Sequence, residues 1–188
     1  MSEAPRPGGS KGQRGRTRAR RAVSPTASGR AEAPHGFDAY EAAEHEHFDS
    51  VIGLEYGDIS GDRVTASIVT GPRHQQPLGL VHGGVYAGVV ESVASVAASV
   101  WAYENLDGQV AIGVSNATDF LRPHREGRLD AVAEPLHRGR RQQLWQVVIT
   151  RADDGKVVAR GQVRLQNVEP DPDTTRADDG KVVARGQV

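Results

Sequence analysis

The sequence predicts an α+β fold in which an antiparallel sheet of about six strands wraps around one long central helix. Two observations lead to this prediction. Residues 83–103 are dominated by Val, Ala and Gly, which is typical of a helix that is apolar on most faces. Short apolar segments separated by turn residues lie on both sides of this run, and such segments are typical of strands. A helix with so little polar surface needs a sheet to cover it.

The first elements are a helix and a hairpin. A short amphipathic helix is expected at 37–49, where apolar residues recur among acids and histidines. Two strands are expected at 51–59 and 63–70, and the turn residues Gly61 and Asp62 between them predict that the strands pair as a hairpin.

The rest of the domain follows the loop at 71–81, which contains two prolines and leads into the central helix at 83–103. Trp145, Val147 and Ile149 occupy alternate positions of an apolar run, so we expect them on one face of a strand. An Asp-Asp-Gly sequence at 153–155 predicts a hairpin turn. Four further strands are expected at 110–121, 128–136, 144–150 and 157–165.

The composition divides the 188 residues into one domain and two tails. Residues 1–36 carry a net charge of +6 and hardly any large apolar side chain, so we expect a disordered basic tail. This charge leaves a nucleic-acid contact open, but we do not expect a nucleic-acid partner. The folded domain should span 37–168. Residues 169–188 are expected to be a poorly ordered linker and repeat, although an extra hairpin arm is the alternative: the fourteen residues at 150–163 recur identically at 175–188.

Cysteine is absent, which excludes disulfides, thiolate metal sites and a cysteine nucleophile. This composition fits a cytoplasmic protein, and no apolar signal-peptide core follows the first residue. His45 and His47 alternate with Glu44 and Glu46, so these side chains do not share a helix face. We therefore expect no metal site and no cofactor.

Glu91 is the only charged residue in the segment 82–103. Burying a carboxylate without partners is costly, so its retention points to a function. On a helix Glu91 shares one narrow face of small residues with Gly84, Gly88 and Ser95. Two structural alternatives are a membrane-spanning helix and a core helix whose acid points into solvent. A central carboxylate disfavours membrane insertion, so we expect no membrane partner.

Four stretches carry a resemblance to a known family. In order they are Gln-Pro-Leu-Gly-Leu-Val-His-Gly-Gly at 76–84, Glu-Ser-Val-Ala-Ser at 91–95, Leu-Arg-Pro at 121–123 and Pro-Leu-His-Arg-Gly-Arg at 135–140, with Trp145 after them. The chain from about 37 to 168 resembles the hotdog-fold acyl-CoA thioesterases. It is most similar to the glutamate-containing branch that hydrolyses aromatic acyl-CoA esters, which includes the 4-hydroxybenzoyl-CoA and 1,4-dihydroxy-2-naphthoyl-CoA thioesterases and adjoins the phenylacetate-pathway enzymes.

The resemblance implies a role for each matching residue. Glu91 would be the nucleophile or the general base on the thioester carbonyl, and the Gly83 amide at the helix start would polarise the carbonyl oxygen. Gln76 and His82 would orient the substrate and the loop, and Ser95 would hold the attacking water or the carboxylate. Phe120 departs from the family, because some relatives have a polar residue there.

Coenzyme A carries phosphates, so an acyl-CoA substrate needs cations at the mouth of its site. The densest basic cluster of the folded part lies at 137–141, and a solvated hairpin tip is its structural alternative. The resemblance also implies a homodimer that assembles into a homotetramer, with the active site between two subunits. The expected coenzyme A contacts are Gly84, Arg122, His137, Arg138, Gly139 and Arg140.

The leading function is therefore hydrolysis of an acyl-CoA thioester, with an aromatic acyl group favoured by the resemblance alone. A non-catalytic acyl-CoA-binding or ligand-sensing module on the same fold is the main alternative. Hydration or dehydration of an acyl chain is a third possibility, but that chemistry usually uses a His–Asp pair in the helix region, and the sequence shows none there.

Overall fold

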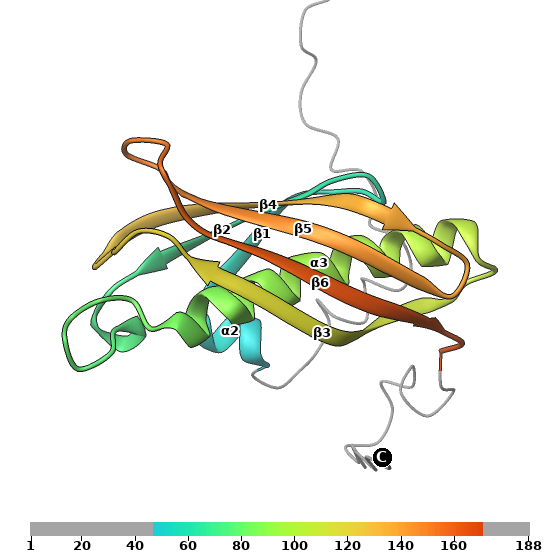
Figure 1. Ribbon diagram of the computed structural model, residues 1–188, viewed down its shortest axis with the longest axis horizontal. Helices are drawn as coiled ribbons and strands as arrows, with labels where there is room; N and C mark the ends of the chain where they lie inside the picture. The colour runs from blue at the N-terminus through green and yellow to red at the C-terminus, as the bar shows by residue number, and fades with distance from the viewer. Residues whose placement is uncertain (1–46, 171–188) are drawn as a thin grey trace, which may run out of the picture. The chain divides into compact units, whose positions relative to one another are not determined.

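The computed structural model describes residues 47–170, and these residues form a sheet curved around one helix (Figure 1). The expected tail at 1–36, the start of the first predicted helix and the second copy of the repeat lie outside the described residues. The elements in chain order are α2 (Phe48–Ile52), β1 (Leu54–Ile59), β2 (Val64–Thr70), the 3₁₀ turn η1 (Pro72–His74), α3 (Gly83–Asn105), β3 (Val110–Phe120), β4 (Gly127–Arg138), β5 (Gln142–Arg151) and β6 (Val157–Val168).

The sheet has six strands in the order β1-β2-β4-β5-β6-β3, and each neighbouring pair is antiparallel. This architecture confirms the predicted α+β fold. Strand β3 pairs with β6 on one side only, so its other side is an edge of the sheet. Such an edge presents unpaired backbone N–H and C=O groups to whatever lies next to it.

Helix α3 packs in the concave face of the sheet and forms most of the core with it (Figure 1). Among the described residues it is the one helix with enough length and apolar composition to cross a membrane. Its apolar side chains instead contact the inner faces of the strands, where Trp145, Val147 and Ile149, predicted to share one face, are buried. The long apolar run is therefore explained by the core of this domain.

The predicted strand at 51–59 is wrong at its beginning. Val51 and Ile52 complete the last turn of α2, and Gly53 ends that helix with a φ of 73°, a left-handed conformation that favours glycine. Strand β1 therefore begins at Leu54. The apolar character of Val51 and Ile52 fits both a strand and a short helix, so the sequence pattern alone placed them in the wrong element.

Candidate active site

Glu91 lies in the middle of α3, on the face that packs against β3. Its side chain is half-buried, and the carboxylate lies directly over Gly113 of β3. A Cβ atom at Gly113 would overlap Glu91 Oε1, so only glycine leaves room for the carboxylate at this point of the strand. The Glu91 carboxylate therefore lies against β3.

Asn116 holds the Glu91 carboxylate in place. Its Nδ2 donates to Glu91 Oε2 at 3.0 Å and to the backbone oxygen of Ala87 at 3.0 Å. Thr118 Oγ1 in turn donates to Asn116 Oδ1 at 2.7 Å. Sequence reasoning missed Asn116 and Gly113, although a glycine and a polar Asn-Ala-Thr run inside an apolar strand were visible signals.

The beginning of α3 leaves one amide free for a ligand. His82 is the N-cap residue, and its Nδ1 accepts a hydrogen bond from the Gly84 amide at 2.9 Å. Its backbone oxygen accepts from the Val85 amide at 2.9 Å. Among the described residues no acceptor lies on the Gly83 N–H, so this donor can serve a bound oxygen atom. His82 thus caps the helix start, and the amide of Gly84, a predicted coenzyme A contact, is already bonded to its side chain.

The loop before α3 presents Gln76 beside this helix start. Gln76 Oε1 accepts from the Leu78 amide at 2.7 Å, which fixes the orientation of the side-chain amide. No acceptor within residues 47–170 lies on its Nε2, and Gln76 lines the same cavity as Gly83. The two predicted residues are therefore brought together, with Nε2 of one and the amide of the other available as donors.

Buried His74 anchors this loop. Its Nδ1 accepts from the Gly71 amide at 3.0 Å, and its Nε2 lies 2.8 Å from the Ile52 oxygen and 3.3 Å from Arg73 Nε. Its backbone oxygen accepts from the His82 amide at 2.8 Å. One side chain thereby ties the end of α2 to the loop that leads to the helix start.

A cavity of about 330 Å³ opens at the beginning of α3. Phe120 forms part of its wall, and a Cβ atom at Gly83 would lie 2.6 Å from the Phe120 ring. Glycine at 83 therefore lets both the ring and a ligand approach the helix start. The remaining wall comes from the loop before α3, from the first turns of α3 and from the segment after β3: Gln76, Leu80, Val81, Tyr86, Leu121, Arg122, Pro123 and His124.

Glu91 does not lie at this cavity in the same chain. It is eight residues beyond Gly83, which corresponds to about 12 Å along the helix axis. Ser95 lies one turn further along the same face and is half-buried. The predicted catalytic residues are thus divided into two groups, one at the helix start and one at mid-helix, and a single carbonyl group cannot contact both within one chain.

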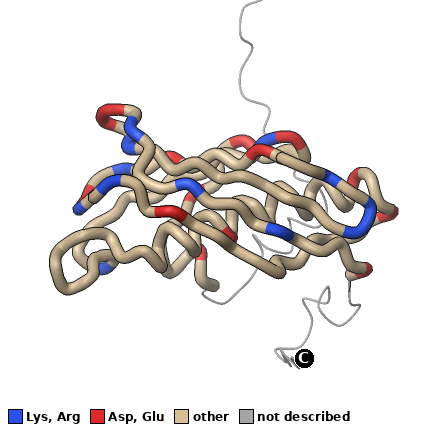
Figure 2. Tube along the Cα trace, viewed as in Figure 1, with Lys and Arg blue, Asp and Glu red and all other residues tan. Residues whose placement is uncertain are grey.

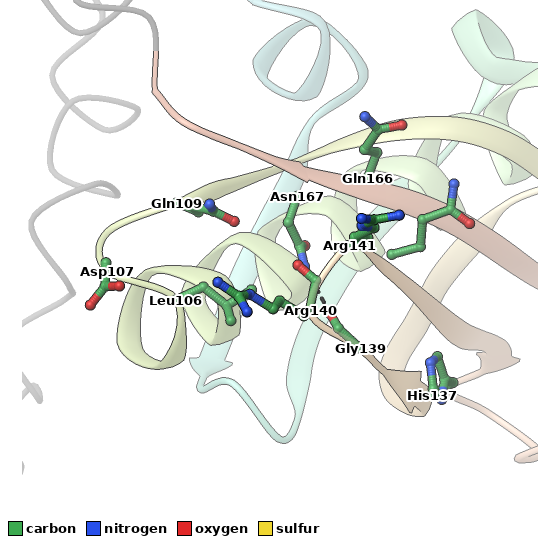
Figure 3. A pocket seen from close by; sticks show the side chains of 10 residues that line it. Leu106, Asp107, Gln109, His137, Gly139, Arg140, Arg141, Gln166 and Asn167 are labelled. Carbon is green, nitrogen blue, oxygen red and sulfur yellow. Dashed lines mark hydrogen bonds between the residues drawn. The ribbon is translucent and has the colours of Figure 1, made fainter.

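The predicted basic cluster lies at the other end of the molecule from the helix start. His137, Gly139 and Arg140 line a hollow of about 1200 Å³ beside Leu106, which directly follows α3 (Figure 3). The 23 residues of α3 separate this hollow from Gly83 by about 35 Å. Figure 2 shows blue positions at the turn between β4 and β5 that forms it.

Two of the predicted phosphate-binding arginines have structural partners. Arg138 Nη1 donates to the Gly61 oxygen at 2.7 Å and to Asp62 Oδ1 at 2.6 Å, and its guanidinium lies 5.5 Å from the Trp101 ring centroid. Arg122 lines the cavity at the helix start, and its Nη1 donates to the Val157 oxygen at 2.7 Å. Arg140 is exposed in the distant hollow.

Within residues 47–170, no group of three or more His, Cys, Asp or Glu side chains is arranged to hold a metal ion. Among the groups of the cavity wall, burial raises the pKa of the Tyr86 hydroxyl, and the nearby positive charge of Arg151 partly opposes this shift. The Tyr86 side chain is therefore a neutral phenol at ordinary pH.

Known proteins are similar to this chain in sequence and in fold. Residues 78–158 match the Thioesterase superfamily. A Mycobacterium tuberculosis protein named "Putative esterase Rv1847" is 50% identical over 125 residues, which are 66% of this chain and 89% of that protein. The structure of that esterase superposes with a TM-score of 0.63 and covers 66% of this chain and 98% of its own.

Two further relatives carry thioesterase names. The proofreading thioesterase EntH of Cronobacter turicensis is 34% identical over 98 residues, which are 52% of this chain and 69% of that protein. The structure of the Haemophilus influenzae thioesterase HI1161 is 29% identical, with a TM-score of 0.59, and covers 64% of this chain and 82% of its own. The fold and these relatives thus define a hotdog thioester hydrolase. The chain belongs to the thioesterase superfamily.

Proposed function

We propose that this chain hydrolyses acyl-CoA thioesters, with Glu91 as the general base or the nucleophile. One observation carries the proposal: a half-buried carboxylate in an apolar helix is held over Gly113 by Asn116. A carboxylate positioned by a dedicated donor fits a general base or a nucleophile better than a solvated surface group. The thioesterase names of the relatives support the same chemistry.

The helix start supplies the second part of the chemistry. The free Gly83 N–H and Gln76 Nε2 can both donate to the carbonyl oxygen as negative charge develops on it. Glu91 takes a proton from a water molecule that attacks the carbonyl carbon, or attacks that carbon itself to form a mixed anhydride that water then hydrolyses. The departing thiolate takes up the proton released from water. In both cases a C–O bond forms, the C–S bond breaks, and the products are the free acid and the coenzyme A thiol.

The separation between Glu91 and Gly83 supports a site built from two copies of the chain. The free edge of β3 exposes Ile112 and Val114, whose side chains are 55% and 47% exposed, and an edge of this kind can pair with the same edge of a second copy. Asn116 contacts Ala87, midway between Gly83 and Glu91 in sequence. A two-fold axis that passes beside Ala87 would bring Glu91 of the partner subunit beside Gly83.

The same arrangement gives the basic cluster a role. When α3 runs antiparallel to its counterpart in the second copy, the basic cluster of the partner subunit lies toward the beginning of α3 in the first chain. Arg140 is then available to the phosphates of a coenzyme A whose thioester lies at Gly83. Arg122 adds a cation at the cavity itself. We propose that the functional unit is at least a dimer, and that dimers pair further into a tetramer.

The cavity favours an aromatic acyl group. Its volume of about 330 Å³ falls at the lower end for small-molecule sites, and Phe120 offers a half-exposed ring on which a flat group can stack. The test is the release of free coenzyme A thiol from a panel of aryl- and alkyl-CoA esters of matched size, ranked by kcat/KM. Turnover with the aryl esters preferred supports the proposal, and saturable binding without turnover would instead favour the non-catalytic binding module.

A further inference from the structure

Two residues of the cavity wall each carry a buried polar atom that lacks a hydrogen-bond partner within residues 47–170. Tyr86 Oη and His124 Nε2 have no hydrogen-bond partner within the described part of the chain, and neither atom is reached by solvent. The two residues are 4% and 8% exposed and line the same cavity, one from α3 and the other from the segment after β3. Neither residue was singled out from the sequence, because a tyrosine in an apolar helix resembles a core residue.

Unpartnered buried polar groups are uncommon in native proteins, because each one loses its hydrogen bonds to water and gains nothing in exchange. Other buried polar groups of this domain follow the rule. His74 makes hydrogen bonds through both ring nitrogens, and buried Gln143 donates to the oxygens of Ala98 and Asn167. The two exceptions at one cavity therefore point to a group that this chain does not itself supply.

The position of the pair relative to Gly83 indicates which part of a ligand it would contact. Tyr86 lies three residues beyond Gly83, about 4.5 Å along the helix axis. The Phe120 ring lies 5.8 Å from the Tyr86 ring, and it also covers Gly83. Phe120 is 57% exposed, so a rotation of its side chain can widen the cavity toward Tyr86 without unpacking the core.

The chemistry of the two atoms limits what they can bind. The Tyr86 hydroxyl is neutral and can donate one hydrogen bond and accept another. His124 Nε2 either donates or accepts, depending on its tautomer. A hydroxyl or carbonyl oxygen can satisfy both, whereas a hydrocarbon would leave both unpaired. The cavity wall also carries the apolar side chains of Val81, Leu121 and Pro123, together with the polar side chains of Gln76 and Arg122.

We propose that Tyr86 and His124 are specificity-determining residues that bind an oxygen substituent on the acyl group, away from the thioester. This inference rests on the proposed thioesterase function and deepens it. A site that leaves two polar groups unpaired rejects the ligand that lacks the matching oxygen. The acyl-CoA ester with an oxygen substituent at the right position is therefore the better substrate.

The experiment compares benzoyl-CoA with its 2-, 3- and 4-hydroxy derivatives, because the position of the oxygen atom is set by the substrate pose. For the wild type, we expect at least one hydroxy derivative to exceed benzoyl-CoA in kcat/KM by about tenfold. Tyr86→Phe keeps the ring and removes the hydroxyl, and it should lower this ratio about five- to tenfold. His124→Leu should lower the same ratio.

Tyr103→Phe is the matched control, because it removes a hydroxyl from the same helix at an exposed position away from the cavity. It should leave the ratio unchanged. Thermal unfolding of each variant separates a loss of specificity from a loss of fold. An unchanged hydroxy-to-benzoyl ratio in both Tyr86→Phe and His124→Leu overturns the inference. If the wild type releases no coenzyme A from any ester, the proposed function itself fails.

Discussion

Asn116 Nδ2 lies 3.0 Å from Glu91 Oε2 and the same distance from the backbone oxygen of Ala87, one turn earlier on the same helix. Both amide hydrogens of Asn116 are thereby used, and its oxygen accepts from Thr118. A side chain from the edge strand thus fixes the carboxylate relative to the backbone of its own helix. Glu91 is held in one orientation before any substrate binds, which is the condition for efficient proton transfer or attack.

Removing the charge of Glu91 should stop catalysis without unfolding the protein. Glu91→Gln keeps the shape of the side chain, and we expect kcat to fall about 10²- to 10⁴-fold, the range typical of a general base. The measurement is thiol release, with thermal unfolding to verify the fold. Glu104→Gln, at an exposed position of the same helix, should retain wild-type activity. Full activity of Glu91→Gln would disprove the catalytic role of Glu91.

Removing the donor to Glu91 should lower kcat with little effect on stability. Asn116 is exposed, so Asn116→Ala creates no cavity, but the Glu91 carboxylate loses its hydrogen bond. A hydrogen bond to a charged group is worth about 1.5–3 kcal/mol, so we expect kcat to fall roughly ten- to hundredfold. Ser115→Ala, one residue away, is the control. Equal kinetics of the two variants would show that Asn116 does not position the carboxylate.

A methyl group at Gly113 should displace Glu91. In Gly113→Ala the new Cβ overlaps Glu91 Oε1, so the carboxylate must move and kcat should fall at least about tenfold. Shortening Glu91 to alanine removes the overlap. The stability cost of Gly113→Ala should therefore be smaller by about 1 kcal/mol in the Glu91→Ala background than in the wild type, as measured by denaturant unfolding. Additive free energies of unfolding would contradict the packing described for this pair.

The fold could be predicted from the sequence because its strongest signals are local. The apolar run predicted that α3 begins at Gly83, and the spacing of Trp145, Val147 and Ile149 predicted which side chains of β5 share a face. The predicted start of the first strand at Val51 was wrong, because two apolar residues before a glycine fit the end of a helix as well as a strand. The order of the strands in the sheet depends on contacts far apart in sequence, and no local pattern encodes them.

The site was predicted less completely than the fold. Glu91 was visible because a charge is rare in an apolar helix. Asn116 and Gly113 act through a contact between α3 and β3, and such a contact is known only after the strand is placed. His124 could not be singled out, because its importance lies in the absence of a hydrogen-bond partner.

The burial of Tyr86 should make the protein sensitive to alkaline pH. Burial raises the pKa of the Tyr86 hydroxyl above its ordinary value of 10.0. The contribution of the neutral phenol to stability is therefore complete below about pH 10 and is lost as the pH rises toward the folded-state pKa, because the unfolded chain ionises first. From about pH 9 to about pH 11, the Tm of the wild type should fall more steeply than that of Tyr86→Phe. Parallel Tm curves for the two proteins would show that the hydroxyl is not buried.

Two inactive variants should restore activity when mixed, because each active site needs residues from two copies of the chain. Glu91→Gln damages the mid-helix group, and Gln76→Ala removes a donor at the helix start. In a mixed dimer one of the two sites receives both defects and the other receives none. Random exchange at equal concentrations should therefore recover about a quarter of wild-type activity.

The variants are mixed after partial unfolding and refolding, so that subunits exchange, and thiol release is measured before and after. The double variant Glu91→Gln/Gln76→Ala mixed with Glu91→Gln is the control and should stay inactive.

The recovery of activity should also require that two chains pair through the β3 edge. Ile112→Asp places a charge on that edge, so it should abolish the recovery and shift the protein toward monomer in sedimentation. A mixture that stays as inactive as its components, although mass spectrometry detects mixed dimers, would place both groups of residues in one chain.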